Sequence, residues 1–180
     1  MITVIFIARD EEEPLLRSLA ALAPLAAEGL IGDVIVADLF SRDATGAVAE
    51  AAGCTLVENC ENERAALERA VKLARKEWLL ALKPGDTPGA PVAASLRDHI
   101  ARYAQTRLPL AFLALSTDAG WGKRSLLGKV FDVFGFAARD SLRLLVPRGE
   151  ADLLSKVAGH WRGARSRAPI ERAVTLDLRS

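Results

Sequence analysis

An unbroken apolar stretch, Ile2-Thr3-Val4-Ile5-Phe6-Ile7-Ala8, opens the chain. Its β-branched residues and its lack of polar alternation predict a strand that is buried on both faces of a sheet. Leucines then recur at helical spacing over residues 11–27, which predicts an amphipathic helix directly after the strand. A strand followed at once by a helix is typical of an α/β protein with a parallel sheet.

The same alternation continues along the chain, so we expect an α/β fold with a mostly parallel sheet and helices on both faces. A length of 180 residues suits one domain with a real core. The first half predicts strands at 34–37, 55–57 and 78–82, and helices at 43–52 and 61–76. The second half is less regular and predicts helices at 92–103, 121–136 and 150–158, strands at 108–115, 142–146 and 173–178, and a loop at 159–169.

The charge is unevenly distributed. Residues 1–90 carry 9 Lys/Arg and 15 Asp/Glu, whereas residues 91–180 carry 15 and 8. Either the two halves attract each other or expose ordinary solvated faces, or the second half offers a basic surface to phosphate or lipid headgroups. Aromatic and basic side chains interleave over residues 121–136, which as an amphipathic helix would suit a membrane surface, or else pack in the core or in a dimer interface.

The chain begins with a strand rather than a basic leader, and no apolar run approaches the ~18 residues of a membrane span. We therefore expect a cytoplasmic protein, with peripheral contact at the inner membrane face as an alternative. Cys54 and Cys60 are expected to be free thiols. We expect no nucleic-acid partner, and P-loop, dinucleotide and nucleophile-elbow motifs are absent from the sequence.

Three segments, taken in order, resemble the nucleotide-binding half of family-2 glycosyltransferases of the GT-A fold. Residues 6–15 resemble the family's I-P-x-x-N-E-E-x-x-L, although Ile7 replaces the usual Pro and Asp10 the usual Asn. Residues 34–45 are similar to V-I-V-V-D-x-x-S-x-D-x-T, and residues 64–82 to the arginine-headed helix and strand that lead to D-x-D. The resemblance covers about residues 2–88. It implies a Rossmann-like nucleotide-sugar-binding half at 1–90 and a shortened, divergent acceptor half at 91–180.

The resemblance also implies roles for particular residues. Asp38, at the carboxyl end of a strand, would accept from a uracil imide or a ribose hydroxyl, and its alternative role is to make the turn. Ala8 and Asp10 would line the base pocket, and Arg64 would either face the nucleotide or be a solvated helix residue. Ser41 and Asp43 are expected to cap the helix that begins near Asp43.

The chain departs from the family at the metal motif. Lys83 stands where the first Asp of D-x-D is expected, Gly85 stands where the second is, and only Asp86 remains. One carboxylate makes a poor Mg²⁺ or Mn²⁺ site. Either Lys83 replaces the charge of the metal beside the diphosphate, with Asp86 nearby, or residues 83–86 are only a turn.

A catalytic base is also not evident. Asp118 and Asp152, the latter in Glu150-Ala151-Asp152, are the candidates for deprotonating an acceptor hydroxyl. The sequence thus favours a glycosyltransferase-like protein that uses a nucleoside diphosphate sugar, most readily of the UDP type, by a route that can do without metal. The alternative is a catalytically inactive homologue that binds a nucleotide or another protein.

Overall fold

The computed structural model describes residues 1–106, 111–114, 142–152, 154 and 169–170, and within them it has a six-stranded sheet with the order β3-β2-β1-β4-β7-β6. Strands β1 to β4 run parallel, β7 runs antiparallel to β4, and β6 runs antiparallel to β7. The sheet is therefore mixed and mostly parallel, as the sequence predicts. The elements are β1 Ile2–Ala8, α1 Glu12–Ala27, β2 Ile31–Asp38, α2 Thr45–Ala51, β3 Thr55–Val57, α3 Glu63–Leu73, β4 Trp78–Leu82, β5 Thr87–Pro88, α4 Ala90–Thr106, β6 Ala111–Ala114, β7 Leu142–Pro147, the 3-10 helix η3 Arg148–Glu150 and β8 Pro169–Ile170.

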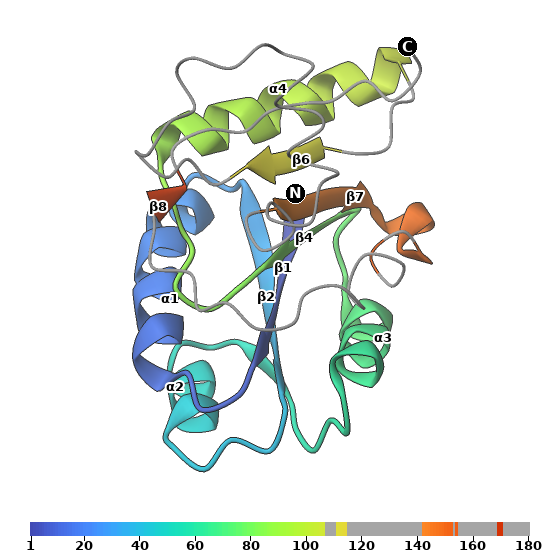
Figure 1. The fold of residues 1–180 in the computed structure, drawn as a ribbon. Helices are drawn as coiled ribbons and strands as arrows, with labels where there is room; N and C mark the ends of the chain where they lie inside the picture. Colours follow the sequence, from blue (N-terminus) through green and yellow to red (C-terminus); the bar gives the residue numbers. More distant parts are fainter. Residues whose placement is uncertain (107–110, 115–141, 153, 155–168, 171–180) are drawn as a thin grey trace, which may run out of the picture.

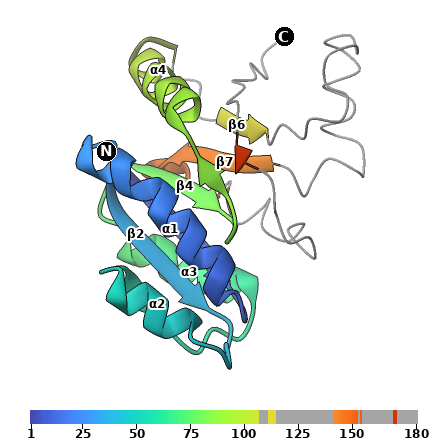
Figure 2. The same ribbon diagram turned by 90° about the vertical axis from the view of Figure 1, so that its left-hand side faces the viewer.

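Helices cover both faces of the sheet. Helices α1, α2 and α4 pack on one face and α3 packs on the other (Figures 1 and 2). Alternate residues of β1 supply the two cores, since Val4 and Phe6 belong to the first and Ile5 to the second. All three side chains are fully buried, which explains why this strand is apolar at almost every position.

The predicted strands at 2–8, 55–57 and 78–82 have the predicted bounds, whereas the helix ends differ by a few residues. Helix α3 begins later than expected because the Asn62 side chain accepts from the Ala65 N–H at 2.9 Å and caps it. It ends at Leu73 because Ala74 is extended. Strand β2 begins at Ile31, earlier than the apolar pattern indicates, since it includes Asp33, whose carboxylate pairs with Arg75 at 3.2 Å.

In the second half, α4, β6 and β7 correspond to the elements predicted at 92–103, 108–115 and 142–146. The predictions for 121–136 and 173–178 lie outside the described residues, as does most of those for 150–158 and 159–169. Cys54 and Cys60 are free thiols, as expected. Among the helices that the structure describes, none is long and apolar enough to cross a membrane.

Candidate functional site

The carboxyl ends of the four parallel strands share one edge of the sheet. Ligands of open parallel sheets bind at this edge. Each of these strands is followed within a few residues by a residue with left-handed backbone: Asp10 (φ 50°), Phe40 (φ 57°), Asn59 (φ 56°) and Gly85 (φ 97°). Asp and Asn tolerate this conformation, whereas a bulky residue such as Phe40 is a clear outlier. Backbone strain of this kind is therefore concentrated at the edge where a ligand is expected.

The loops that follow β1 and β2 are cross-linked to each other at this edge. The Asp10 N–H donates to Ser41 Oγ at 2.9 Å, and the Arg42 N–H donates to Asp10 Oδ1 at 2.6 Å. Ser41 therefore does not cap the helix of its own loop, as the sequence suggested, but holds the neighbouring loop. The backbone of the predicted pocket residue Asp10 is fixed by this pair of bonds.

The same cross-linking caps α1. The cap residue Glu11 gives α1 no side-chain cap of its own. Instead, the Glu11 N–H donates to Thr45 Oγ1 at 2.9 Å and the Glu12 N–H donates to Asp43 Oδ2 at 3.1 Å. Asp43 also accepts from the Thr45 N–H at 3.0 Å, so its predicted capping role extends to both helices. Burial raises the pKa of the Asp43 carboxyl, but the hydrogen bonds from Thr45 and from the Glu12 N–H outweigh it and leave that pKa lowered.

Asp38 ends β2 at the centre of this edge. Its half-buried carboxylate accepts the Ser41 N–H at 3.1 Å and 3.3 Å, and its carbonyl oxygen accepts the Cys60 N–H at 3.1 Å. The turn role that the sequence offered is therefore present. A carboxylate has roughly four lone-pair sites, so this shared N–H leaves acceptor capacity for a ligand.

Ala8 and Arg64, two other residues predicted to contact the nucleotide, both have partners within the protein. Ala8 is fully buried in the core beneath α1, and its carbonyl oxygen accepts the Leu39 N–H at 2.9 Å. The Arg64 side chain is 77% exposed and pairs with Glu68 one helical turn away at 3.0 Å. The methyl group of Ala8 therefore packs against protein, and Arg64 forms an ordinary surface ion pair.

The turn after β4 is held rigidly at the same edge. The Gly85 N–H donates to Ser18 Oγ at 2.8 Å and to the Pro14 carbonyl oxygen at 3.0 Å, which fastens the turn to α1. The Lys83 N–H donates to Asp86 Oδ2 at 2.7 Å. Residues 83–86 therefore form the turn that the sequence offered as one alternative, and the ammonium nitrogen of Lys83 is itself buried.

Asp86 is fully buried and pairs with an arginine that the sequence analysis did not single out. Arg143 of β7 is also fully buried, and it donates to Asp86 Oδ2 from Nε and to Oδ1 from Nη2, the latter at 2.8 Å. Both carboxylate oxygens are therefore engaged. No local sequence signal indicates this pair, because the two residues are 57 positions apart.

Of the two carboxylate candidates for catalysis, only Asp152 is among the described residues, and it does not lie at this edge. Strand β7 runs antiparallel to β4, with Pro147 opposite Trp78, so Asp152 follows β7 beside the amino end of β4. The Arg148 N–H donates to the Glu77 carbonyl oxygen at 2.7 Å and fixes this arrangement. Asp152 therefore lies at the edge opposite Asp38, whereas Asp118 lies outside the described residues.

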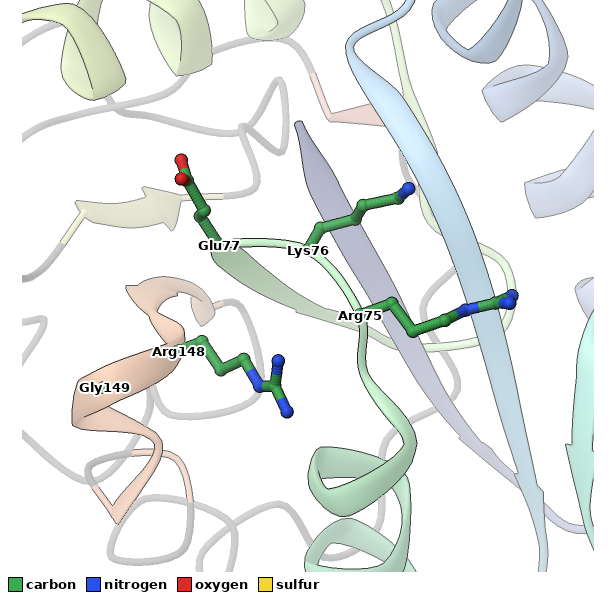
Figure 3. Close-up of a pocket in the computed structure, with 5 residues that line it drawn as sticks. All are labelled: Arg75, Lys76, Glu77, Arg148 and Gly149. Atoms are coloured by element: carbon green, nitrogen blue, oxygen red, sulfur yellow. The ribbon is translucent and has the colours of Figure 1, made fainter.

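A hollow of about 550 Å³ lies at that opposite edge, lined by Arg75, Lys76, Glu77, Arg148 and Gly149. Its charged side chains do not converge. Figure 3 shows Arg75 and Lys76 extending toward β1 and β2, Arg148 on the other side of the hollow, and the Glu77 carboxylate pointing away from both. Arg75 is moreover paired with Asp33. This hollow is not an organised anion site.

The mostly parallel sheet with helices on both faces matches the GT-A glycosyltransferase fold of solved structures. Three of the solved structures that match the chain illustrate this likeness. Glucosyl-3-phosphoglycerate synthase from Mycobacterium tuberculosis, in complex with Mn²⁺, UDP and phosphoglyceric acid, has a TM-score of 0.57 at 16% identity over 83% of this chain and 56% of that one. Mannosyl-3-phosphoglycerate synthase from Rubrobacter xylanophilus has a TM-score of 0.59 at 15% identity over 99% and 68%. TarS from S. aureus has a TM-score of 0.61 at 15% identity over 85% and 48%.

At such identities the likeness establishes the fold alone. The chain spans 56% of the glucosyl-3-phosphoglycerate synthase and about half, 48%, of TarS. No protein-family model and no curated protein sequence matches it.

The first of these proteins is in complex with Mn²⁺. The question is therefore whether the described residues of this chain could also hold a divalent cation. Divalent cations of this kind take several oxygen ligands, chiefly carboxylates and water. The described residues contain no group of three or more His, Cys, Asp or Glu side chains that could hold a metal ion. Asp86, the one acid in the turn after β4, is engaged by Arg143. The described residues therefore do not fit the ion.

Proposed function

We propose that this chain binds a nucleoside diphosphate sugar of the UDP type at the edge formed by the ends of β1 and β2, and transfers its sugar to an acceptor. The observation that carries this proposal is the placement of Asp38. Asp38 is the last residue of β2 and lies at the carboxyl ends of the parallel strands, where ligands of this fold class bind. Both of its carboxylate oxygens accept the Ser41 N–H of the following turn. The loops after β1 and β2 are cross-linked beside it.

The chemistry of Asp38 favours uracil. A carboxylate accepts from the N3–H of uracil, whereas the N3 of cytosine is itself an acceptor and would be repelled. Asp10 stands beside this position, since its own carboxylate and N–H connect the two loops. We leave Ala8 and Asp86 out of the proposed contact set because both are fully buried. Arg64, which is largely exposed, remains a secondary candidate, as does Lys83, although its ammonium nitrogen is buried.

The test is calorimetric titration of UDP and CDP with EDTA present. We expect wild-type protein to bind UDP more tightly than CDP. Asp38→Asn keeps an acceptor for the Ser41 N–H but replaces the charged acceptor, so UDP binding should weaken by about 10- to 100-fold and base preference should be lost. The matched control is Asp33→Asn, on the same strand near its other end, which should bind like wild type. Equal UDP affinity in Asp38→Asn would contradict the proposal.

A second candidate function is nucleotide binding without transfer, by a catalytically inactive relative. It is favoured by the position of Asp152 at the opposite edge, which leaves no candidate base among the described residues near Asp38. The two functions differ in turnover. Release of UDP from a bound UDP-sugar, with the sugar passing to water or to an added alcohol as acceptor, supports the transferase. Stable binding with no UDP release over a long incubation with these acceptors supports the inactive relative.

A further inference from the structure

We infer that Arg143 takes the place of a divalent cation at the carboxyl end of β4, so that this edge holds nucleotide without metal. The statement about nucleotide rests on the proposed function, whereas the exclusion of the metal ion rests on the described residues alone. Arg143 comes from β7, in the half of the chain where the family resemblance fades, and the carboxylate that it engages comes from the turn after β4.

The register of the sheet brings the two residues together. Ala81 of β4 is paired with Leu144 of β7, so Arg143 comes next to the end of β4, where the turn at 83–86 begins. Arg143 and Asp86 are both fully buried. Their contact is bidentate, with Nε on one carboxylate oxygen and Nη2 on the other. This fork-to-fork geometry is the strongest form of an arginine–carboxylate pair.

The pair leaves little coordination capacity on Asp86, because three of the roughly four lone-pair sites of its carboxylate are occupied. Oδ2 accepts from both Arg143 and the Lys83 N–H, and Oδ1 accepts from Arg143. A metal ion would have to displace the guanidinium and leave it buried without its counter-ion, which is strongly unfavourable. It would also meet the positive charges of Arg143 and Lys83 in a region of low dielectric constant. The guanidinium is thus a permanent cation in the place where an exchangeable one would bind.

The pair is also integrated into the fold. The turn that carries Asp86 is fastened to α1 through Gly85, and Arg143 fastens it to β7. A metal centre can lose its ion, whereas this guanidinium is covalently part of β7 and is paired with a turn that is fastened to α1. The charge at this edge is therefore constant, whatever the supply of divalent cations.

The first experiment measures Mn²⁺ binding directly. Bound Mn²⁺ loses its sharp electron paramagnetic resonance signal, so titration of wild-type protein without nucleotide should leave the signal of free Mn²⁺ undiminished. Asp86→Asn and the control Asp33→Asn should give the same result. Stoichiometric binding of Mn²⁺ to wild type that is lost in Asp86→Asn but kept in Asp33→Asn would overturn the inference.

The second experiment compares UDP affinity in EDTA and in excess Mn²⁺. We expect the two dissociation constants to agree within about twofold, whereas tightening by tenfold or more with Mn²⁺ would overturn the inference. Absence of UDP binding in both conditions would contradict the proposed function and leave the Mn²⁺ titration as the test of the inference. The two failures are thus distinguishable.

A third arm tests the pair itself by substitution. Arg143→Lys keeps the charge but removes the bidentate contact, so the urea midpoint of unfolding should fall. The double variant Asp86→Asn/Arg143→Gln replaces the ions by a neutral amide pair and should fold with no gain of Mn²⁺ binding. An Arg143→Lys protein with the midpoint of wild type would contradict a bidentate buried pair.

Discussion

Phe40 is the residue at which backbone conformation and residue type disagree most. Its φ of 57° is left-handed, and its side chain is 51% exposed, so packing of the ring does not explain the conformation. Its neighbours do explain it. The Leu39 N–H is held by the Ala8 carbonyl oxygen, and the Ser41 N–H by the Asp38 carboxylate. The turn geometry that positions Asp38 therefore imposes the strain on Phe40.

This strain predicts an inverted order of stability for two truncations of Phe40. Phe40→Gly and Phe40→Ala both remove the ring, and they differ only in the Cβ that clashes when φ is positive. At an ordinary position Ala is favoured over Gly by roughly 0.5–1 kcal/mol. Here we expect the Gly variant to be the more stable, by about 1 kcal/mol, in urea unfolding followed by circular dichroism. An Ala variant more stable than the Gly variant, by the ordinary difference of roughly 0.5–1 kcal/mol, would show that residue 40 is not left-handed.

At the scale of elements, the sequence predicts best where one short segment contains all the information. The strands at 2–8 and 78–82 are buried on both faces, so nearly every side chain in them is apolar and their bounds are visible. The start of α1 is not visible in this way, because its capping groups are Asp43, in the loop before α2, and Thr45, the first residue of α2. A helix end that is satisfied by distant side chains leaves no signature in its own sequence.

The residues of the candidate site also differ in whether the sequence alone can identify them. Asp38 is found from the sequence because it follows a recognisable strand inside a motif. Arg143 is not, because its role depends on the antiparallel pairing of β7 with β4, which no local pattern specifies. The same pairing moves Asp152 to the opposite edge from Asp38. Residue types near a strand end can thus be predicted, whereas the edge at which a later strand ends requires the topology.

A buried histidine lies where α4 packs on the sheet, and we expect its protonation in acid to destabilise this packing. His99 of α4 is 3% exposed, and its ring lies edge-on to Trp78 of β4 with the centroids 5.6 Å apart. Tyr103, from the next turn of the helix, contacts the same indole at 5.0 Å. Burial lowers the pKa of His99, and the positive charge of Arg102 lowers it further.

A lowered histidine pKa predicts lower stability in acid. The unfolded chain takes up the proton at the ordinary pKa near 6.5, while the folded chain resists it, so the free energy of unfolding falls as the pH drops below about 6.5. The slope is at most about 1.4 kcal/mol per pH unit for one proton. Urea unfolding between pH 5 and 8 measures it in a His160→Phe background, where His99 is the only histidine. Adding His99→Phe should flatten the profile, and an unchanged slope would assign the effect to carboxylates.

At the scale of the whole molecule, described elements from the two halves recognised in the sequence share one sheet and one core, and we propose that the halves fold as one unit. Strand β4 lies in the first half, yet one of its two neighbours in the sheet is β7 from the second. Helix α4 contributes Val92, Ala93 and Leu96 to the same core as α1. The buried Arg143–Asp86 pair also connects the halves, at the carboxyl end of β4. Among the described residues, the boundary of the resemblance near residue 90 therefore does not separate two sheets or two cores.

It follows that residues 1–90, expressed alone, should not fold cooperatively. Removing β7 exposes the free edge of β4 and takes away Leu144, Leu145 and Val146, which are at most 1% exposed. Each such side chain contributes roughly 1.5–3 kcal/mol when buried. Their sum alone is comparable to the 5–15 kcal/mol that stabilises a typical domain, and Asp86 would also lose its counter-ion. We expect the fragment to show no sigmoidal urea transition and to self-associate through β4, whereas the full chain unfolds in one step. A monomeric fragment with a cooperative transition would mean that the nucleotide-binding half carries its own stability and that β7 is only an addition to its edge.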